Sequence, residues 1–221
     1  MIGALFQRDL RLAMRRPADV LTPIGFFLII ATLFPLAIGP SPELLTLMRS
    51  AILWIAVLLA SLPSFERLYQ DDYHQGLLDR LIMARTPLWE YALTRIASHI
   101  VIMGIPFLAT LPIIALFFGI ELVFLPLLAM MVALGLTSLT LLGSMAASLT
   151  LGARQSSVLS AVLILPLAFP ILIFGTMATH ALLTDNPYHQ HLALLGAVTC
   201  LFLVLSPAAT FYALRTATEE R

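Results

Sequence analysis

Long apolar runs alternate with short polar segments along the whole chain. A helix of about 20 mostly apolar residues spans a lipid bilayer, and lipid admits only segments that satisfy their own backbone hydrogen bonds. The pattern therefore predicts an all-α integral membrane protein with a single transmembrane domain over residues 1–221. The six expected transmembrane helices cover roughly residues 20–38, 46–65, 95–118, 122–151, 156–179 and 192–213, the second including an amphipathic lead.

Residues 2–16, ahead of the first run, have a helical pattern of a different kind. Apolar and basic side chains recur on opposite faces, with Ile2, Phe6, Leu10 and Ala13 on one and Arg8, Arg11 and Arg15 on the other. A basic amphipathic helix of this kind lies in the headgroup plane of a membrane. We therefore expect an N-terminal interfacial amphipathic helix. The alternative is a charged lead-in to the first span.

Composition supports a membrane protein and indicates its orientation. The chain is 60% hydrophobic and 11% charged, whereas soluble domains carry about 25% charged residues. All twelve basic residues are arginine, and six spans with the N-terminus inside place only Arg49 outside the cytoplasm. The other eleven are Arg8, Arg11, Arg15, Arg16, Arg67, Arg80, Arg85, Arg95, Arg154, Arg215 and Arg221. Because basic residues concentrate in cytoplasmic segments, we predict a multi-pass membrane protein with both termini in the cytoplasm.

The segment Phe65–Leu81, between the second and third spans, is the longest charged stretch of the chain. Seven of its seventeen side chains are Arg, Asp, Glu or His, so it must lie in water or against protein. After a predicted break at Gly76, apolar residues recur from Leu77 to Ile82 with helical spacing. We expect an amphipathic element within residues 66–94, on the cytoplasmic face. It is either a docking surface for a partner such as a motor subunit or a solvated loop held by its own charge pairs.

The chain lacks the residues that an enzyme or a self-powered transporter needs. It contains neither the His-Glu-x-x-His pattern of metalloproteases nor the Gly-x-Ser-x-Gly of serine hydrolases, and no phosphate-binding loop. His99 is the only clear ionisable residue well inside a predicted span, and we expect it to hydrogen-bond to a neighbouring helix. Pumps and ion-coupled carriers use ionisable groups inside the membrane. The sequence therefore predicts no catalytic and no metal site, and any work must be powered by another chain.

The charged stretch resembles a segment of ABC-2-type exporter permeases. The resemblance rests on Phe65-Glu66-Arg67, Asp72, Gly76-Leu77-Leu78-Asp79-Arg80-Leu81 and Thr86-Pro87. It implies a cytoplasmic coupling helix between spans two and three that sits in a cleft of a partner ATPase, where ATP is bound. The residues implied to contact the ATPase or to act as a hinge are Glu66, Arg67, Asp71, Asp72, Gly76, Leu78, Asp79 and Arg80.

A closer resemblance, to the family of haem exporter permeases that act in cytochrome c maturation, covers nearly the whole chain. It is carried by Thr32-Leu33-Phe34-Pro35-Leu36 with Ile38-Gly39-Pro40, by Leu163–Leu167 with Pro170, and by Leu205-Ser206-Pro207. It implies a protein of the bacterial inner membrane that works with a second copy of the chain, a cytoplasmic ATPase subunit, haem-handling membrane subunits C and D, and a periplasmic haem chaperone. Haem is then the expected cargo. Whether haem itself is exported or the loaded chaperone is released stays open, as do a generic exporter of lipid, glycan or drug and a non-transporting scaffold.

Three of the five histidines, His180, His189 and His191, lie in or beside the only long external loop. Imidazole is a common axial ligand of haem iron, so these residues are candidates for contact with haem. Ordinary solvent-exposed loop histidines are the alternative. We predict no cofactor that is bound permanently by this chain.

Overall fold

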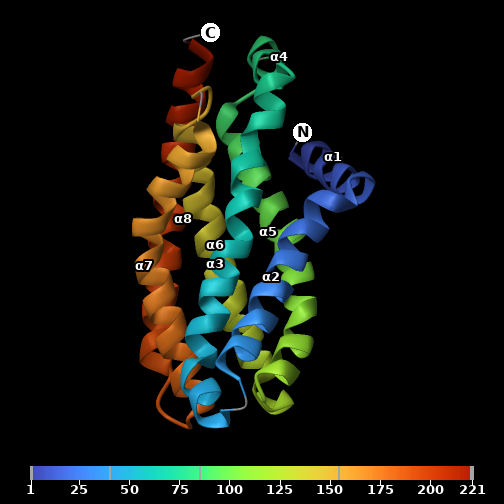
Figure 1. Cartoon of the computed structure of the whole chain (residues 1–221). Helices are drawn as coiled ribbons and strands as arrows, with labels where there is room; N and C mark the ends of the chain where they lie inside the picture. The colour runs from blue at the N-terminus through green and yellow to red at the C-terminus, as the bar shows by residue number, and fades with distance from the viewer. Residues whose placement is uncertain (1, 40, 85, 154, 220–221) are drawn as a thin grey trace.

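The computed structural model describes residues 2–39, 41–84, 86–153 and 155–219, and all its regular elements are helices (Figure 1). These are α1 (Ile2–Arg15), α2 (Pro17–Ile38), α3 (Pro42–His74), α4 (Leu77–Met83), α5 (Leu88–Phe117), the 3₁₀ turn η1 (Leu122–Phe124), α6 (Leu125–Leu149), α7 (Ser156–Leu183) and α8 (His189–Glu219). Pro40, Arg85, Arg154 and Arg221, which enter the predictions above, lie outside the described residues.

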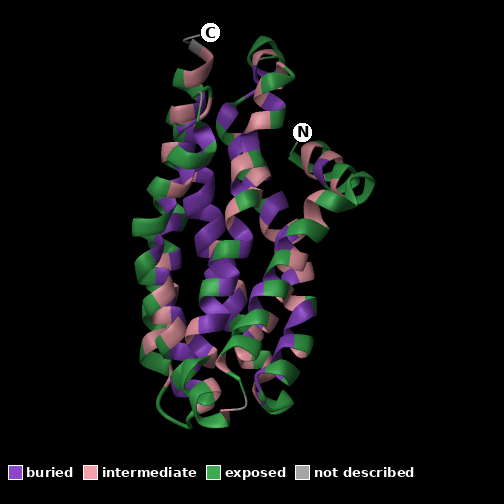
Figure 2. Ribbon diagram, viewed as in Figure 1, coloured by how far each residue is buried: buried purple, intermediate pink, exposed green. Residues whose placement is uncertain are grey.

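Six helices in the described part of the chain are long and apolar enough to cross a membrane, which confirms the predicted number of spans. They are Pro17–Ile38, Pro42–His74, Leu88–Phe117, Leu122–Leu149, Ser156–Leu183 and His189–Thr218. Their outer surfaces carry large exposed apolar side chains such as Leu36, Leu116 and Val204. The buried residues follow the centre of the bundle and the exposed ones its outside (Figure 2).

The bundle has two different ends. The N-terminus, α4 and the C-terminal end of α8 lie at one of them (Figure 1), which we call the polar end. Helix α1 lies across the bundle axis there and packs against α5 and α2, as expected of an interfacial helix. The other end consists of short connections, where Gly39 and Gly119 adopt positive φ angles of 75° and 59°.

The second span does not end where its apolar run ends. Helix α3 continues without a break through Glu66 and Asp72 to His74, and α5 begins at Leu88, ahead of its apolar run. The charged segment is thus mainly a helical extension of α3 above the bundle, followed by the short α4. The chain turns at Gly76, whose φ of 67° is left-handed, a conformation that glycine adopts without strain.

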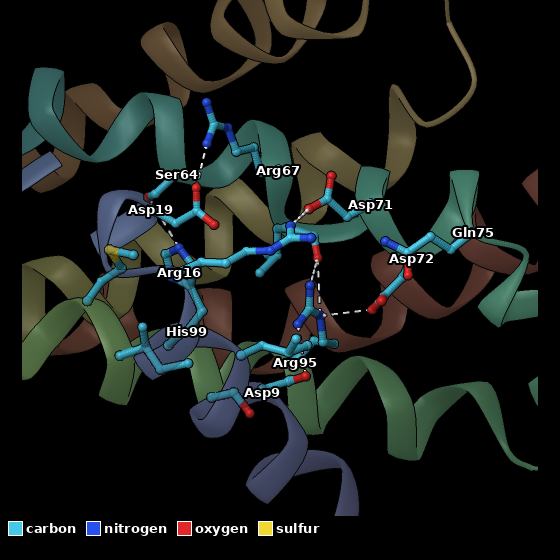
Figure 3. Close-up of a pocket in the computed structure, with 16 residues that line it drawn as sticks. Asp9, Arg16, Asp19, Ser64, Arg67, Asp71, Asp72, Gln75, Arg95 and His99 are labelled. Carbon is cyan, nitrogen blue, oxygen red and sulfur yellow. Dashed lines mark hydrogen bonds and ion pairs between the residues drawn. The ribbon is translucent and has the colours of Figure 1, made fainter. Parts of the chain in front are cut away.

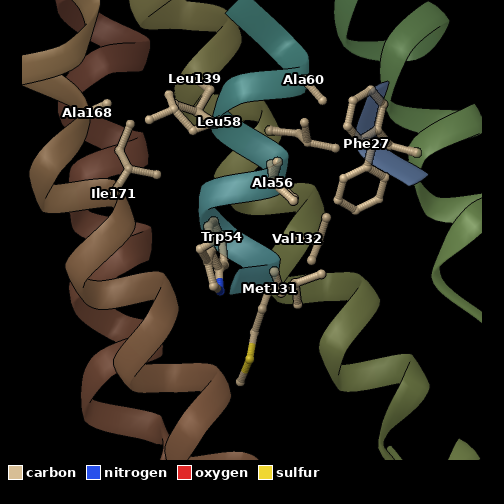
Figure 4. Close-up of a cluster of buried hydrophobic side chains, with 14 of the residues drawn as sticks. Phe27, Trp54, Ala56, Leu58, Ala60, Met131, Val132, Leu139, Ala168 and Ile171 are labelled. Carbon is tan, nitrogen blue, oxygen red and sulfur yellow. The ribbon is translucent and has the colours of Figure 1, made fainter. Parts of the chain in front are cut away.

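Trp54 of α3 is one of the largest fully buried side chains of the apolar core (Figure 4). A Cβ atom on Gly135 of α6 or Gly175 of α7 would lie only 2.2 or 2.5 Å from the indole ring. Both helices can therefore approach the ring only because these positions are glycine. The indole nitrogen donates a 2.9 Å hydrogen bond to Thr179 Oγ1. This contact satisfies the one polar atom of a buried tryptophan.

Hydroxyl groups join α6 to its neighbours along the same core. The contacts are Ser138 Oγ to Thr199 Oγ1 at 2.7 Å, Tyr69 Oη to Ser144 Oγ at 2.7 Å, Ser144 Oγ to Thr210 Oγ1 at 3.1 Å, and the Ser206 hydroxyl donating to the Leu141 carbonyl at 2.5 Å. Small hydroxyl residues let membrane helices pack closely and hydrogen-bond across the interface. Helix α6 is therefore the central helix to which α3 and α8 are attached.

Candidate functional site at the polar end

Four charged side chains from three helices meet at the polar end. We call Arg8 and Asp9 of α1, Asp72 of α3 and Arg95 of α5 the ion quartet. Arg8 Nη2 lies 2.9 Å from Asp9 Oδ1 and 3.0 Å from Asp72 Oδ2. Arg95 Nη1 lies 3.1 Å from Asp9 Oδ1, and its Nε lies 3.5 Å from Asp72 Oδ2. Each carboxylate thus contacts both guanidinium groups, and the quartet is electrically neutral.

The quartet is inside the protein and is further bonded there. The side chains of Asp9 and Asp72 are 1% and 9% exposed. Tyr91 donates a 2.7 Å hydrogen bond to Asp72 Oδ2, and Arg95 Nη2 donates a 2.5 Å bond to the Leu68 carbonyl. Charges removed from water need this kind of pairing because an unpaired buried charge is very costly. The quartet therefore ties the interfacial helix to the polar ends of two spans.

The Arg8 guanidinium shows how these effects balance. Burial lowers its pKa, while the charges of Asp72 and Asp9 and its bonds to them raise it, and the net pKa is above the ordinary value for arginine. Arg8 is therefore a permanent cation in this position. The attachment of α1 therefore depends on the charge of Arg8, and this charge does not change with pH near neutrality.

Two exposed ion pairs surround the quartet. Arg67 Nη1 lies 2.7 Å from Asp19 Oδ1, and Arg16 Nη1 lies 3.6 Å from Asp71 Oδ2. The side chains of all four residues are at least 40% exposed. Pairs in such positions contribute little to stability because water and salt screen them. Their donors and acceptors are accessible to other ligands.

A cavity of about 210 Å³ opens between α1, α3 and α5 beside the quartet (Figure 3). Arg16, Asp19, Arg67 and Asp71 line it together with Asp9, Asp72 and Arg95. The lining also includes Ser64, Ser98, His99, Ile102 and Met103. Two buried polar atoms of this lining, Asp9 Oδ2 and Ser98 Oγ, have no hydrogen-bond partner in the described part of the protein.

Helix α4 projects beyond the quartet and has two distinct faces. Leu78 and Leu81 are buried, packed in a cluster with Leu68, Tyr69 and Leu214. Ile82 and Met83, on the opposite face, are 44% and 77% exposed. Arg80 is exposed as well. The buried face attaches α4 to α3, and the other face, which we call the open face, is exposed.

The residues predicted to contact an ATPase do not form one surface. Asp72 and Leu78 are buried inside the protein, so the expectation that they are exposed on a coupling surface is not met. The half-buried Glu66 lines a separate groove with Ser157 and Ser160 of α7. Arg67 and Asp71 lie at the cavity mouth, while Gly76, Asp79 and Arg80 belong to α4 and its start. The difference arises because α3 stays helical through this segment, so successive side chains point in different directions.

Sequence reasoning did not find the quartet, although two signals were present. Arg95 opens an apolar run, and a charged residue at the edge of a span needs a partner. Arg8 and Asp9 are adjacent in a helix that was expected to present its polar face to water. An acidic residue beside the basic face was the available sign of an internal partner.

The histidines take different positions. His99 is buried, with Nδ1 3.3 Å from Thr140 Oγ1 and Nε2 3.2 Å from Ser64 Oγ, so the predicted interhelical role is confirmed. His180 and His189 are exposed near the end opposite α4, and His189 packs on Tyr188 with ring centres 4.1 Å apart. The partly buried His191 has no partner for its Nδ1 among the described residues. No group of three potential metal ligands occurs in the described part of the chain.

Comparison with known proteins identifies the family. A family model described as CcmB protein matches residues 1–217. The chain belongs to the CcmB family. Relatives named heme exporter protein B are similar over nearly their whole lengths, which confirms the family resemblance seen in the sequence. The protein from Haemophilus influenzae is 39% identical over 211 residues (96% of each chain), and that from Escherichia coli K12 is 40% identical over 215 residues (97% of this chain and 98% of the relative). The CcmB relative from Pseudomonas aeruginosa is 37% identical over 220 residues, covering 100% and 99% of the two chains.

Proposed function

We propose that this chain is the membrane subunit of a haem export complex in cytochrome c biogenesis. The observation that carries the proposal is the nearly full-length similarity to relatives named heme exporter protein B. Six long apolar helices fit a permease, and the sequence contains no phosphate-binding loop. We assign ATP hydrolysis to a separate cytoplasmic ATPase subunit. A second copy of this chain, membrane subunits C and D and a periplasmic haem chaperone complete the proposed assembly.

We assign the ATPase contact to the open face of α4, which keeps Arg80 from the set expected from the sequence and adds Ile82 and Met83. Ile82, Met83 and Arg80 are exposed there, at the polar end that the arginine distribution orients toward the cytoplasm of a bacterial inner membrane. Leu78 contributes to the contact indirectly, because its buried side chain holds α4 against the bundle. Asp72 does not contact the ATPase in this assignment, because it is buried as part of the ion quartet.

This arrangement gives a physical route for coupling. A displacement of α4 acts on α3, because the two helices are joined at Gly76 and share a buried cluster. The quartet then connects α3 to α1 and α5 through ion pairs. A push from the ATPase would thereby reach three helices at once and change their packing. Such a shift either exports haem or releases the loaded chaperone.

The contact is tested by adding a charge to the open face of α4. Met83→Asp should abolish covalent c-type cytochromes, measured by haem-stained gels, while the protein stays in the membrane. Thr216→Asp adds the same charge to an exposed position of α8 at the same end and should leave maturation intact. Equal maturation in the two variants would refute the assignment to α4.

Transport is separated from scaffolding by measuring haem itself. Sealed inverted vesicles that contain the complex should accumulate haem with ATP and not without it if haem is the exported cargo. ATP-dependent release of the loaded chaperone without haem accumulation would select the second mechanism. A complex that matures cytochromes equally well with an inactive ATPase would support the scaffold and refute coupling. Replacing His180, His189 and His191 together by alanine tests their proposed contact with haem in the same assay.

A further inference from the structure

Helix α1 has three faces with different surroundings. Residues four apart lie on the same face of a helix, and Leu5, Asp9 and Ala13 form the face toward the bundle. Leu5 packs against the buried cluster that also holds α4, Asp9 is buried in the ion quartet, and Ala13 lines the cavity. Figure 1 shows that α1 extends sideways from the bundle. The bundle therefore covers one face of α1 and leaves the other two open.

The second face of α1 is apolar and exposed. It consists of Ile2, Phe6, Leu10 and Met14, again spaced four apart. Ile2, Leu10 and Met14 are 48%, 39% and 69% exposed. Leaving such a stripe in water is unfavourable, whereas beside six membrane-spanning helices it can enter the boundary between lipid headgroups and acyl chains. This face therefore places α1 on the membrane surface.

The third face of α1 carries two arginines without an acidic partner. Arg11 and Arg15 are both exposed, and four residues along a helix separate them by about 6 Å. Neither side chain forms an ion pair or a hydrogen bond in the described part of the chain. Arg8, which the sequence pattern groups with them, is instead turned toward Asp72 and pairs with it at 3.0 Å. The exposed basic face is therefore narrower than the sequence indicates, but it is not neutralised.

The charges around α1 balance except at this third face. The ion quartet is neutral with all four members counted, and each of the two exposed ion pairs beside it is neutral as well. The remaining charged residues of α1 are Arg11 and Arg15. The outward side of the helix thus has two uncompensated positive charges, and it calls for a partner with net negative charge.

A phospholipid with net negative charge fits both open faces of α1. Its acyl chains cover the apolar face, and its phosphate accepts hydrogen bonds from guanidinium groups. A zwitterionic lipid meets the first requirement and not the second, because its ammonium group balances the charge of its phosphate. An acidic protein surface meets the second requirement and not the first.

We propose that Arg11 and Arg15 bind the phosphate groups of anionic phospholipids, such as phosphatidylglycerol, in the membrane leaflet at the polar end. Helix α1 is then held from two sides, by the ion quartet toward the bundle and by lipid charge away from it. Its attachment to the membrane depends on lipid composition through these two arginines. This binding is independent of what the protein exports.

The test measures which lipid gathers beside α1. Phe6→Trp in a Trp89→Phe background places an indole on the apolar face, while Trp54, fully buried, adds a constant signal. The full-length protein is reconstituted in vesicles that contain an equal fraction of either brominated phosphatidylglycerol or brominated phosphatidylcholine. Quenching at position 6 should indicate about tenfold tighter association of phosphatidylglycerol at low salt, and added salt should reduce this preference. Equal quenching by the two lipids at low salt would overturn the proposal.

Variants of the reporter protein locate the preference. Arg11→Gln combined with Arg15→Gln should bring the ratio of the two lipids close to one, whereas Arg80→Gln, at an exposed position of α4, should leave it unchanged. Leu10→Gln should weaken quenching by both lipids and keep their ratio. A preference that survives the double substitution would contradict the assignment to these arginines. No lipid preference, together with loss of binding to the purified ATPase subunit in the double variant, would replace the lipid by an acidic protein surface.

Discussion

The two regions that hold this bundle together do so by different physics. Around Trp54, helices α3, α6 and α7 approach one another through glycines and an aromatic ring, whose indole nitrogen is hydrogen-bonded to Thr179. At the polar end, α1, α3 and α5 are joined by the ion quartet and bounded by a cavity. The first region depends on shape, and its energy comes from close packing. The second depends on charge, which acts over longer distances than packing contacts do.

The two regions should therefore differ in how easily their helices can be displaced. Packing around Trp54 is short-ranged and requires one arrangement of the helices, so it resists displacement. Ion pairs tolerate larger changes in distance because Coulomb attraction falls off slowly. The polar end is therefore the part of the protein that would move most easily under a force applied to α4. The packed region is the part against which it moves.

The largest expected effect belongs to the packed region. Trp54→Ala should lower the free energy of unfolding in detergent by about 4 kcal/mol, because it removes a buried ring and leaves a cavity. Trp89→Ala removes the same side chain from a position that is 50% exposed and should cost far less. A small effect of Trp54→Ala would show that the glycine-lined contact is not a main source of stability.

Substitutions in the ion quartet should have the second-largest effect on stability. Asp72→Asn leaves Arg8 and Arg95 facing only Asp9, so one buried positive charge is uncompensated, and the expected loss is about 3 kcal/mol. The neighbouring Asp71→Asn removes a carboxylate that is 55% exposed and should change stability by less than about 1 kcal/mol. If the two variants unfold alike, the quartet does not hold α1 in place.

Added volume at the core should have a moderate effect. Gly135→Ala places a methyl group 2.2 Å from the Trp54 ring, and such overpacking costs about 2 kcal/mol. Gly104→Ala is the matched control because nothing lies within 4 Å of its new methyl group, and it should be neutral or stabilising. Equal unfolding temperatures for the two variants would contradict the close approach of α6 to α3.

The smallest effect on stability is expected at the exposed ion pairs around the quartet. Arg67→Gln breaks the exposed pair with Asp19 and should change the free energy of unfolding by less than about 1 kcal/mol. The same substitution at Arg95, inside the quartet, should cost several times more, as measured by thermal unfolding under identical conditions. A comparable loss of stability at both positions would contradict the distinction between the quartet and the exposed ion pairs.

The transmembrane part of this fold is predictable because lipid leaves the chain little choice. Each long apolar run must form a helix to satisfy its backbone, and the structure has a helix at every one. The pairing of His99 with neighbouring helices was predictable for the same reason, since a buried polar ring needs partners. The interfacial helix was visible from the alternation of apolar and basic residues between Ile2 and Arg15.

The candidate site was less predictable because its contacts join distant parts of the chain. Arg8 and Asp72 are 64 residues apart, and nothing in either local segment identifies the other as its partner. The charged stretch suggested a separate element, but helix propagation does not stop at polar residues and ended only near Gly76. Residues that appear equally exposed in the sequence, such as Asp71 and Asp72, therefore have opposite environments in the structure.

The central claim, that the open face of α4 receives the ATPase, is tested most directly by cross-linking. Met83→Cys, in a background with Cys200→Ser, is labelled with a benzophenone maleimide and irradiated in the complex with the purified ATPase subunit. Thr216→Cys and Met14→Cys, both exposed at the polar end, serve as controls. We expect a cross-link to the ATPase from position 83 that is much stronger than from either control. Cross-links from position 216 or 14 with none from position 83 would contradict it.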